Sequence, residues 1–265
     1  ASAINGETGD LLLDPIDITI STSATSAIQN TTDTWESDDS SGSSIINVSD
    51  LLTSLSSANV TISTQQNSGS QTAPAGGDIT VSSAIDNSAN NNNLTLIAGE
   101  DVSIFGAITM GSSGDLTINA GQRGDINSGA VLATAALTAN DLIVTADTGI
   151  TIINAVVDTM DLTINQTGSI SVSNTQSYTL NAATNNSSLT ATSTSGNITV
   201  GTINAGSADV TLTSAGTITD LTTGADSGAN ITASTVTLAA AAGIGATGTA
   251  DIDTAANTLV LSTTT

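Results

Sequence analysis

Acidic side chains are the residues of this sequence with the clearest capacity for chemistry. The 265 residues include 24 Asp and Glu, against one basic residue, Arg123, and no His. Calcium is bound by six to eight oxygen atoms, mostly from clustered carboxylates and carbonyls. Carboxylates that recur along the chain are therefore candidate calcium ligands: Asp101, which follows Glu100, and four that each directly precede a Leu or Val, namely Asp115, Asp141, Asp161 and Asp209.

Both a calcium site and solvated carboxylates are consistent with this pattern. In favour of calcium, carboxylates stacked at one point of a repeating structure repel one another, and a cation between them would offset that repulsion. The sequence contains neither an EF-hand loop nor a G-G-x-G-x-D calcium repeat. Solvated surface carboxylates remain the alternative to a calcium site, and no other cofactor is expected.

A second candidate site is the tripeptide Arg123-Gly124-Asp125, which matches the integrin-type adhesion motif. Gly-Asp also precedes apolar segments at Gly77-Asp78 and Gly114-Asp115, so a repeat alone supplies two of the three residues. Only Arg123 distinguishes an adhesion site from a repeat corner.

Catalysis and nucleic-acid binding have little support in the sequence. Cys and His are absent, which removes the commonest nucleophiles and general bases. Paired carboxylates hydrolyse glycosides in other proteins, but the aromatic or basic residues that would hold a sugar are almost absent. A net charge of −23 excludes the phosphate neutralisation that nucleic-acid binding requires. A non-enzymatic protein is therefore expected, with a carbohydrate-active enzyme and an ice-binding protein as weaker alternatives.

The elements that would position these residues must form a core almost without aromatic side chains. The chain has one Phe, one Trp and one Tyr, yet 38% of its residues are hydrophobic. β-Branched residues dominate the apolar set, which favours strands. Ile, Leu, Val and Ala must therefore fill small units that need nothing larger.

Short apolar strands recur with a period of about 24 residues. Two series can be followed, and each takes seven steps over 165 residues. One runs through Leu94, Leu116, Leu142, Leu162, Leu189, Val210, Val236 and Leu259. The other runs through Ile79, Val102, Ile126, Ile150, Ile170, Ile198, Ile218 and Ile244. A softer third series begins with Ile85, Ile108, Val131 and Val156.

This period predicts an all-β, right-handed parallel β-helix with three short strands per coil. A three-strand unit cannot bury its own apolar face, but it can when it is stacked on copies of itself. Each strand would pair in parallel with its equivalent in the next coil, and the crossover rule favours a right-handed path. The repeats are expected over residues 65–265.

Residues 1–64 follow the repeat less well but should continue into it. Strands are expected on either side of Pro15, and residues 21–44, around Trp35, are expected to form a loop or an excursion from the stack. A short helix should follow, with Ser49 as its N-cap and Leu51, Leu52 and Leu55 as its buried stripe. A strand over 59–64 and a loop over 65–77 lead into the repeats.

The first half of the chain resembles the filamentous-haemagglutinin-like exoproteins, which are secreted by the two-partner route. The resemblance covers residues 8 to about 121 and rests on an ordered series of segments: LLLDPIDITI (11–20), DLLTSLSSANVTIST (50–64), GDITVSSAI (77–85) and LTLIAGEDVSIFGAI (94–108). It implies a β-helical shaft, an outer-membrane transporter as partner, and roles in adhesion, biofilm formation or toxin delivery. The N-P-N-G secretion motif and a C-terminal effector are absent from this sequence.

The sequence therefore predicts a structural β-helix that is secreted or lies at the bacterial cell surface, outside the outer membrane, as the shaft of an adhesin. A host receptor or a glycan would be its ligand. The alternative is a protomer that stacks head-to-tail into an extracellular filament, because both ends of the repeat look uncapped, as in the strand 257–262. No leader is visible before Ala1, so a leader has been removed or the chain is a piece of a longer protein.

Overall fold

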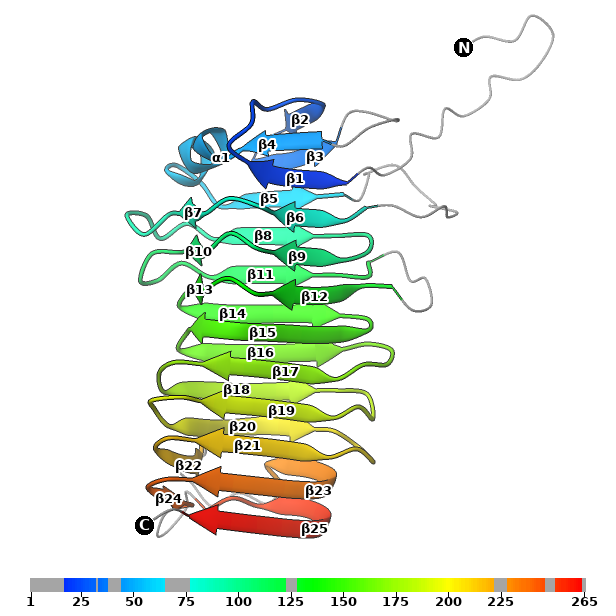
Figure 1. The fold of residues 1–265 in the computed structure, drawn as a ribbon, viewed down its shortest axis with the longest axis vertical. Helices are drawn as coiled ribbons and strands as arrows, with labels where there is room; N and C mark the ends of the chain where they lie inside the picture. The colour runs from blue at the N-terminus through cyan, green and yellow to red at the C-terminus, as the bar shows by residue number, and fades with distance from the viewer. Residues whose placement is uncertain are drawn as a thin grey trace, which may run out of the picture.

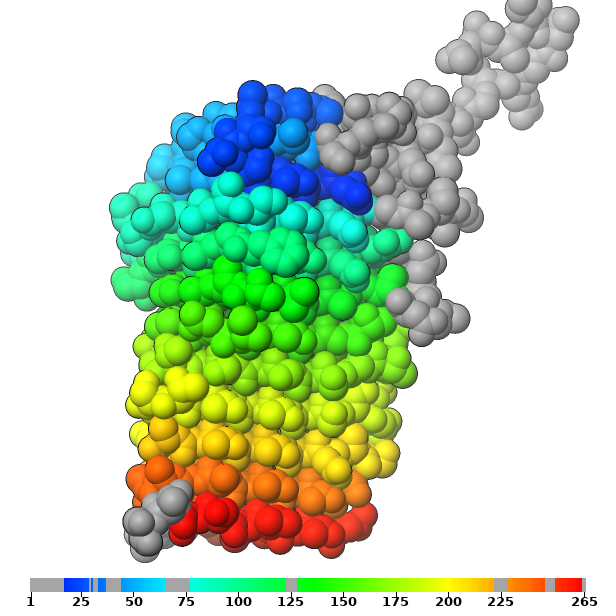
Figure 2. Space-filling model, in the orientation of Figure 1, coloured from blue at the N-terminus to red at the C-terminus, as the bar shows by residue number. Residues whose placement is uncertain are grey.

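The protein folds as a parallel β-helix, which confirms the predicted fold class (Figure 1). The computed structural model describes residues 17–31, 33–37, 44–64, 77–122, 128–221, 228–245 and 251–263. It has about nine turns of about 23 residues each. At roughly 4.8 Å per turn, the stack is roughly 43 Å long. The colours of the space-filling view follow one another as layers along this axis (Figure 2).

Two columns of parallel strands form the walls. Column 1 contains, from the N-terminal end, β4 (Ser44–Asn47), β1 (Ile18–Ser21), β6 (Ile79–Val81), β9 (Val102–Ile104), β12 (Ala130–Ala133), β15 (Gly149–Val156), β17 (Ile170–Asn174), β19 (Leu189–Ser193), β21 (Val210–Ser214), β23 (Ile231–Ala240) and β25 (Thr254–Thr263). Column 2 contains β3 (Thr34–Ser37), β5 (Val60–Ser63), β8 (Leu94–Ile97), β11 (Leu116–Asn119), β14 (Asp141–Ala146), β16 (Thr159–Ile164), β18 (Tyr178–Ala183), β20 (Ile198–Asn204), β22 (Thr217–Asp220) and β24 (Gly243–Ile244).

A third, short column closes the first turns. It consists of β7 (Ile85–Asp86), β10 (Ile108–Thr109) and β13 (Leu137–Thr138), and it ends where Leu137 pairs with Ala155 inside β15. From β14 to β21 the turns are shorter, 18 to 21 residues between paired strands, and have two longer strands instead of three. The last turns lengthen again, since Val236 follows its partner Val210 by 26 residues. Three strands per coil is therefore correct only for the first part of the repeat.

Alternation along each strand produces the core. In β11, Leu116 and Ile118 are fully buried, while Thr117 and Asn119 are only partly buried. The same aliphatic side chains lie over one another from turn to turn, because a side-chain period of two keeps each face constant. The result is one continuous core from Ile18 to Ala240.

The two predicted ladders exchange columns halfway along the chain. The first four members of the first series lie in column 2, whereas Leu189, Val210, Val236 and Leu259 lie in column 1. Conversely, Ile79, Val102, Ile150 and Ile170 lie in column 1, and the last three members of the second series, Ile198, Ile218 and Ile244, lie in column 2.

Unequal turn lengths explain this error. Ile170 lies opposite Leu189, only 19 positions later, whereas Val102 lies opposite Val131, 29 positions later. Val131 thus occupies the ladder position predicted for Ile126, which lies outside the described residues. Leu162 pairs with Val144, and Leu142 pairs with Met160.

The N-terminal end of the stack is covered, contrary to the expectation of two uncapped ends. The segment around Trp35, predicted as a loop, contains an antiparallel hairpin of β2 (Ile28–Thr31) and β3. Trp35 is 6% exposed and lies opposite Ile62 of the next turn. Ser26 forms an antiparallel bridge with Ile45 of β4, so β2 and this bridge occupy the outer edges of both columns.

The predicted helix is present as α1 (Val48–Leu55). Leu51 and Leu55 are fully buried, as expected, and Leu52 packs against the core from a partly exposed position. Its N-cap is Asn47 instead of Ser49, because Asn47 Oδ1 accepts a hydrogen bond from the Ser49 N–H at 2.8 Å. The helix packs beside β4 and β5 at the covered end.

Candidate functional site: the open C-terminal end and the acidic turns

The last strand of the described residues, β25, lies beside an apolar interior. β25 pairs with β23 on one side, and no other strand of the described residues pairs with it. Leu259 is 47% exposed and Leu261 is 56% exposed, although their partners Val236 and Leu238 in the preceding turn are buried. The exposure of these two leucines therefore follows from their place in the last turn.

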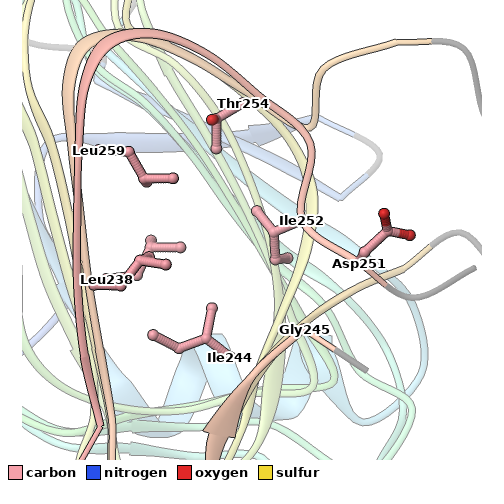
Figure 3. A pocket seen from close by; sticks show the side chains of 8 residues that line it. Leu238, Ile244, Gly245, Asp251, Ile252, Thr254 and Leu259 are labelled. Carbon is pink, nitrogen blue, oxygen red and sulfur yellow. The ribbon is translucent and has the colours of Figure 1, made fainter. Parts of the chain in front are cut away.

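A cavity of about 440 Å³ lies inside this end. Viewed along the axis, Leu238, Ile244, Ile252 and Leu259 point into it, whereas the carboxylate of Asp251 points away (Figure 3). Leu261 also lines the cavity. Two of these residues, Ile244 and Leu259, belong to the predicted core series, and the cavity lies at the end of that core in the last described turn.

The predicted calcium ligands do not come together. Asp101 and Asp209 precede column 1 strands, and Asp115 precedes a column 2 strand. Asp141 and Asp161 belong to β14 and β16, but Asp141 lies opposite Thr159 instead of Asp161. Among the residues that the structure describes, no group of three acidic side chains could hold a metal ion.

The carboxylates instead connect successive turns through backbone N–H groups. Asp17 Oδ1 accepts hydrogen bonds from the N–H groups of Gly77 and Asp78, both at 3.1 Å. Asp78 Oδ1 accepts from the Asp101 N–H at 2.9 Å, and Asp101 Oδ1 accepts from the Ala130 N–H at 2.7 Å. Each side chain thus satisfies the first donors of a strand in the following turn.

An equivalent ladder precedes column 2 and mixes Asn with Asp. Asn59 Oδ1 accepts from the Asn93 N–H, and Asn93 Oδ1 accepts from the Asp115 N–H, both at 2.9 Å. Asp115 Oδ1 then accepts from the Asn140 side-chain amide at 3.0 Å and from the Asp141 N–H at 3.3 Å. The amide and carboxylate oxygens are interchangeable here because the donor is a neutral backbone N–H.

The remaining two candidates make similar contacts. Asp209 Oδ1 accepts from the Thr235 N–H at 3.0 Å. Asp161 Oδ1 accepts from the Asn181 side-chain amide at 2.6 Å, on the outer face of column 2. These contacts give four of the five carboxylates a structural role between turns, whereas Asp141 contributes its backbone N–H to this ladder.

The pKa of the Asp78 carboxyl is changed by its surroundings. Partial burial and the nearby charges of Asp17, Asp101 and Glu100 raise the pKa of Asp78, although its hydrogen bond from the Asp101 N–H opposes the rise. In contrast, hydrogen bonds from Ser88 lower the pKa of the exposed Asp86. The Asp78 carboxylate is thus held among like charges at neutral pH.

A buried polar corner was not predicted from the sequence. Asn174, Ser193 and Ser214 lie opposite one another at the ends of β17, β19 and β21 and point into the interior. Asn174 Nδ2 donates to the carbonyls of Val157 and Gln176, and Ser214 Oγ donates to the carbonyls of Gly196 and Thr217. These side chains donate hydrogen bonds to backbone carbonyls at the corner where the chain leaves the strand. In the sequence the only signal for this arrangement is a polar residue at the end of each strand, which is weak.

A shallow outer groove over β16, β18 and β20 was also missed. Its cavity volume is about 450 Å³, and four of its lining residues are Asn165, Asn185, Asn186 and Asn204. Asn185 and Asn186 have φ values of 47° and 62°. Asn185 donates to backbone carbonyls of the preceding turn, and Asn186 accepts from the Ser207 N–H of the following one, so both amides hold the corner together.

The Arg123-Gly124-Asp125 tripeptide lies outside the described residues. Within the described residues, none of the helices has the length and apolar character needed to cross a membrane.

Comparison of the chain with models of protein families, with curated proteins and with solved structures found no match. The architecture therefore identifies the fold as a parallel β-helix.

Proposed function

We propose that this chain is a rod-like spacer on the bacterial cell surface, the shaft of a haemagglutinin-like exoprotein. The observation that carries the proposal is the uninterrupted stack of turns around one aliphatic core. A stack of this kind resists bending and fixes the distance between whatever lies at its two ends. The segments that resemble this exoprotein group, such as LTLIAGEDVSIFGAI, contain strands of the stack.

The composition of the surface is a second argument for an extracellular location. Outward positions of the strands are mostly Thr, Ser and Asn, and the chain carries a charge of −23 without a single Cys. High net charge of one sign keeps a protein soluble and prevents nonspecific self-association. We propose that export uses an outer-membrane transporter of the two-partner type and that the protein acts without catalysis.

Surface labelling tests this role. An antibody raised against the folded chain should label intact cells of the source organism, and brief protease treatment of those cells should remove the label. Inactivation of the cognate transporter should abolish labelling of intact cells while the protein is still found in lysates. An antibody against a periplasmic protein is the control, and labelling that requires permeabilised cells would rule out the proposal.

Adhesion needs a separate test, because a shaft can bind a ligand itself or serve only as a spacer. The ligand would be a host receptor or a glycan. Arg123→Ala removes the only basic residue of the chain. Reduced attachment of cells or coated beads would assign adhesion to the tripeptide, and unchanged attachment would leave the chain as a spacer.

A further inference from the structure

We propose that the outer groove lined by Asn165, Asn185, Asn186 and Asn204, the Asn groove, binds a neutral oligosaccharide. The four side chains come from the ends of β16, β18 and β20 and from the loops that follow them, which lie one over another along one edge of the rod (Figure 1). The groove volume of about 450 Å³ is in the range of small-molecule sites. The biological role of this binding rests on the proposed function, because only a shaft exposed at the cell surface would meet the glycans of another cell.

Two of the four amides use their donor end to hold the backbone. Asn185 Nδ2 donates to the carbonyls of Asn165 and Gln166, at 2.8 and 2.6 Å. Asn165 Nδ2 donates to Asp147 Oδ1 at 3.1 Å. The Oδ1 atoms of Asn165 and Asn185 accept no hydrogen bond from the part of the chain that the structure describes, so both can accept one from a ligand.

The other two amides are used in the opposite sense. Asn186 Oδ1 accepts from the Ser207 N–H at 3.1 Å, and Asn204 Oδ1 accepts from the Gly206 N–H at 3.0 Å. Within the described ranges their Nδ2 groups donate no hydrogen bond. The groove therefore offers two donor groups and two acceptors whose orientation the backbone already fixes, and such preorganised groups lose little freedom on binding.

Small residues make this surface hollow. Ala183 is exposed and lies between Thr163 and Asn204, its partners in the neighbouring turns. A Cβ at Gly206 would lie 2.1 Å from Asn186 Oδ1, so glycine at this position lets the amide reach its backbone partner. A second hollow of about 270 Å³ on the outer face of column 2 shares Ala183 and Asn204 with the Asn groove. Together they form one extended depression, as a chain of sugar rings requires.

The lining indicates the class of ligand. All residues that line the Asn groove are uncharged, although the chain has 24 acidic residues. Asp161 lies in the adjoining hollow, where it accepts from the Asn181 amide. A sugar hydroxyl both donates and accepts hydrogen bonds, so a row of hydroxyls matches a groove that offers both.

The same features disfavour other ligands. The net charge of −23 repels an anion, and a cation would meet the two amide donor groups. A peptide strand finds no free edge here, because β18 pairs with β16 on one side and with β20 on the other.

NMR titration of the whole, isotope-labelled chain tests this binding. The neutral probes are maltotriose, cellotriose, mannotriose and chitotriose, and the comparison probes are trigalacturonate and N-acetyltriglycine amide. We expect a dissociation constant of about 1 mM or lower for at least one neutral trisaccharide, with shifts of the Asn186 and Gly206 backbone signals. The constant should be the same in about 0.05 M and about 0.5 M NaCl, since no charged group takes part. Both comparison probes should bind at least about tenfold more weakly.

Two substitutions remove the donors and keep the corners. In Asn186→Asp and Asn204→Asp the oxygen that accepts from the backbone remains, and together they should weaken binding at least about tenfold. The matched control is Asn197→Asp at the opposite end of β20, where Asn197 Oδ1 accepts from the Thr217 N–H at 2.8 Å. It should leave the dissociation constant unchanged. Ala183→Gln, an outward position, fills the hollow without touching the amides and should weaken binding as strongly.

Three outcomes would each overturn the proposal. They are no binding of any neutral trisaccharide, binding of trigalacturonate or of the peptide that equals or exceeds it, and equal weakening by the groove variants and by Asn197→Asp. Thermal melting of each variant shows that it is folded. None of these outcomes bears on the surface-labelling test of the shaft function.

Discussion

Close backbone contacts set the tightest corners of the β-helix at the scale of single residues. Gly168 has a φ of 150°, and a Cβ at this position would lie 1.5 Å from the Thr148 carbonyl oxygen of the preceding turn. Gly149, in the same pair of turns, has its nearest neighbour at 3.5 Å, the Ser169 carbonyl oxygen. One glycine is therefore required by the fold, and the other is not.

Substitution of these two glycines should have very different effects. We expect Gly168→Ala to lower the free energy of unfolding by about 3 kcal/mol or more. The added Cβ would clash with the backbone carbonyl of Thr148, which cannot rotate aside as a flexible side chain could. Gly149→Ala should change it by less than about 0.5 kcal/mol. Urea unfolding followed by circular dichroism measures both, and equal effects would contradict the contact geometry.

The raised pKa of Asp78 gives a pH prediction with a definite sign. A carboxyl whose pKa is higher in the folded state binds its proton more tightly there, so its stabilising contribution is present at low pH and is lost as pH rises through the folded pKa. At neutral pH the ionised group remains among Asp17, Asp101 and Glu100. Asp78→Asn keeps the oxygen that accepts from the Asp101 N–H and removes the charge.

We therefore expect Asp78→Asn to stabilise the protein at neutral pH by up to about 1 kcal/mol, since partly exposed charges interact weakly. The gain should vanish at about pH 3, where the wild-type carboxyl is protonated. Asp86→Asn is the control, because hydrogen bonds lower the pKa of Asp86 and its neutralisation should not stabilise the protein at neutral pH. The comparison requires urea unfolding of both variants at the two pH values.

At the scale of elements, the turn is the unit of the structure. Contacts of each strand are almost all with its equivalents in the preceding and following turns. Ile170 lies opposite Ile150 on one side and Leu189 on the other, so Leu189 has the same inward position as Ile170. A whole turn can in principle be removed without changing which face each strand buries.

Deletion of residues 170–188 tests this independence. The deletion removes β17 and β18 together and brings β19 against β15 and β20 against β16. We expect a folded protein whose melting temperature falls by roughly 5 °C, because repeat stability is approximately a sum over neighbouring units. Deletion of residues 170–178 removes half a turn and misaligns both columns, so it should abolish the cooperative melting transition seen by circular dichroism.

At the scale of the whole molecule, electrostatics opposes the fold. The chain carries a charge of −23, and among the described residues carboxylates such as Asp17, Asp78 and Asp101 follow one another in successive turns. Their hydrogen bonds to backbone N–H groups offset part of the repulsion. The remainder is long-range and should respond to ionic strength.

We expect the melting temperature to rise by several degrees between about 0.01 M and about 0.5 M NaCl. At constant ionic strength EDTA should leave it unchanged, since carboxylates such as Asp101, Asp115 and Asp209 already accept hydrogen bonds from the protein. Differential scanning calorimetry measures both effects. A fall in melting temperature on EDTA treatment, reversed by added calcium, would instead show a calcium site.

The sequence by itself determined the fold class and the inward side of most strands. Alternation in Leu116–Asn119 and its return at intervals of about two dozen residues are local signals that any parallel stack must satisfy. Leu51 and Leu55 were likewise recognisable as the buried side of a helix, because helical spacing is also local. Only the tertiary structure decided which strands lie over which.

Which strand lies over which cannot be predicted locally, because strands such as Leu162–Thr163–Ile164 and Leu189–Thr190–Ala191 fit either column equally well. The number of residues in a turn is set by how the turns stack and not by the strands themselves. Turns of 19 and 29 residues therefore coexist in one ladder. The hairpin that buries Trp35 and the partners of the carboxylates depend in the same way on neighbours distant in sequence.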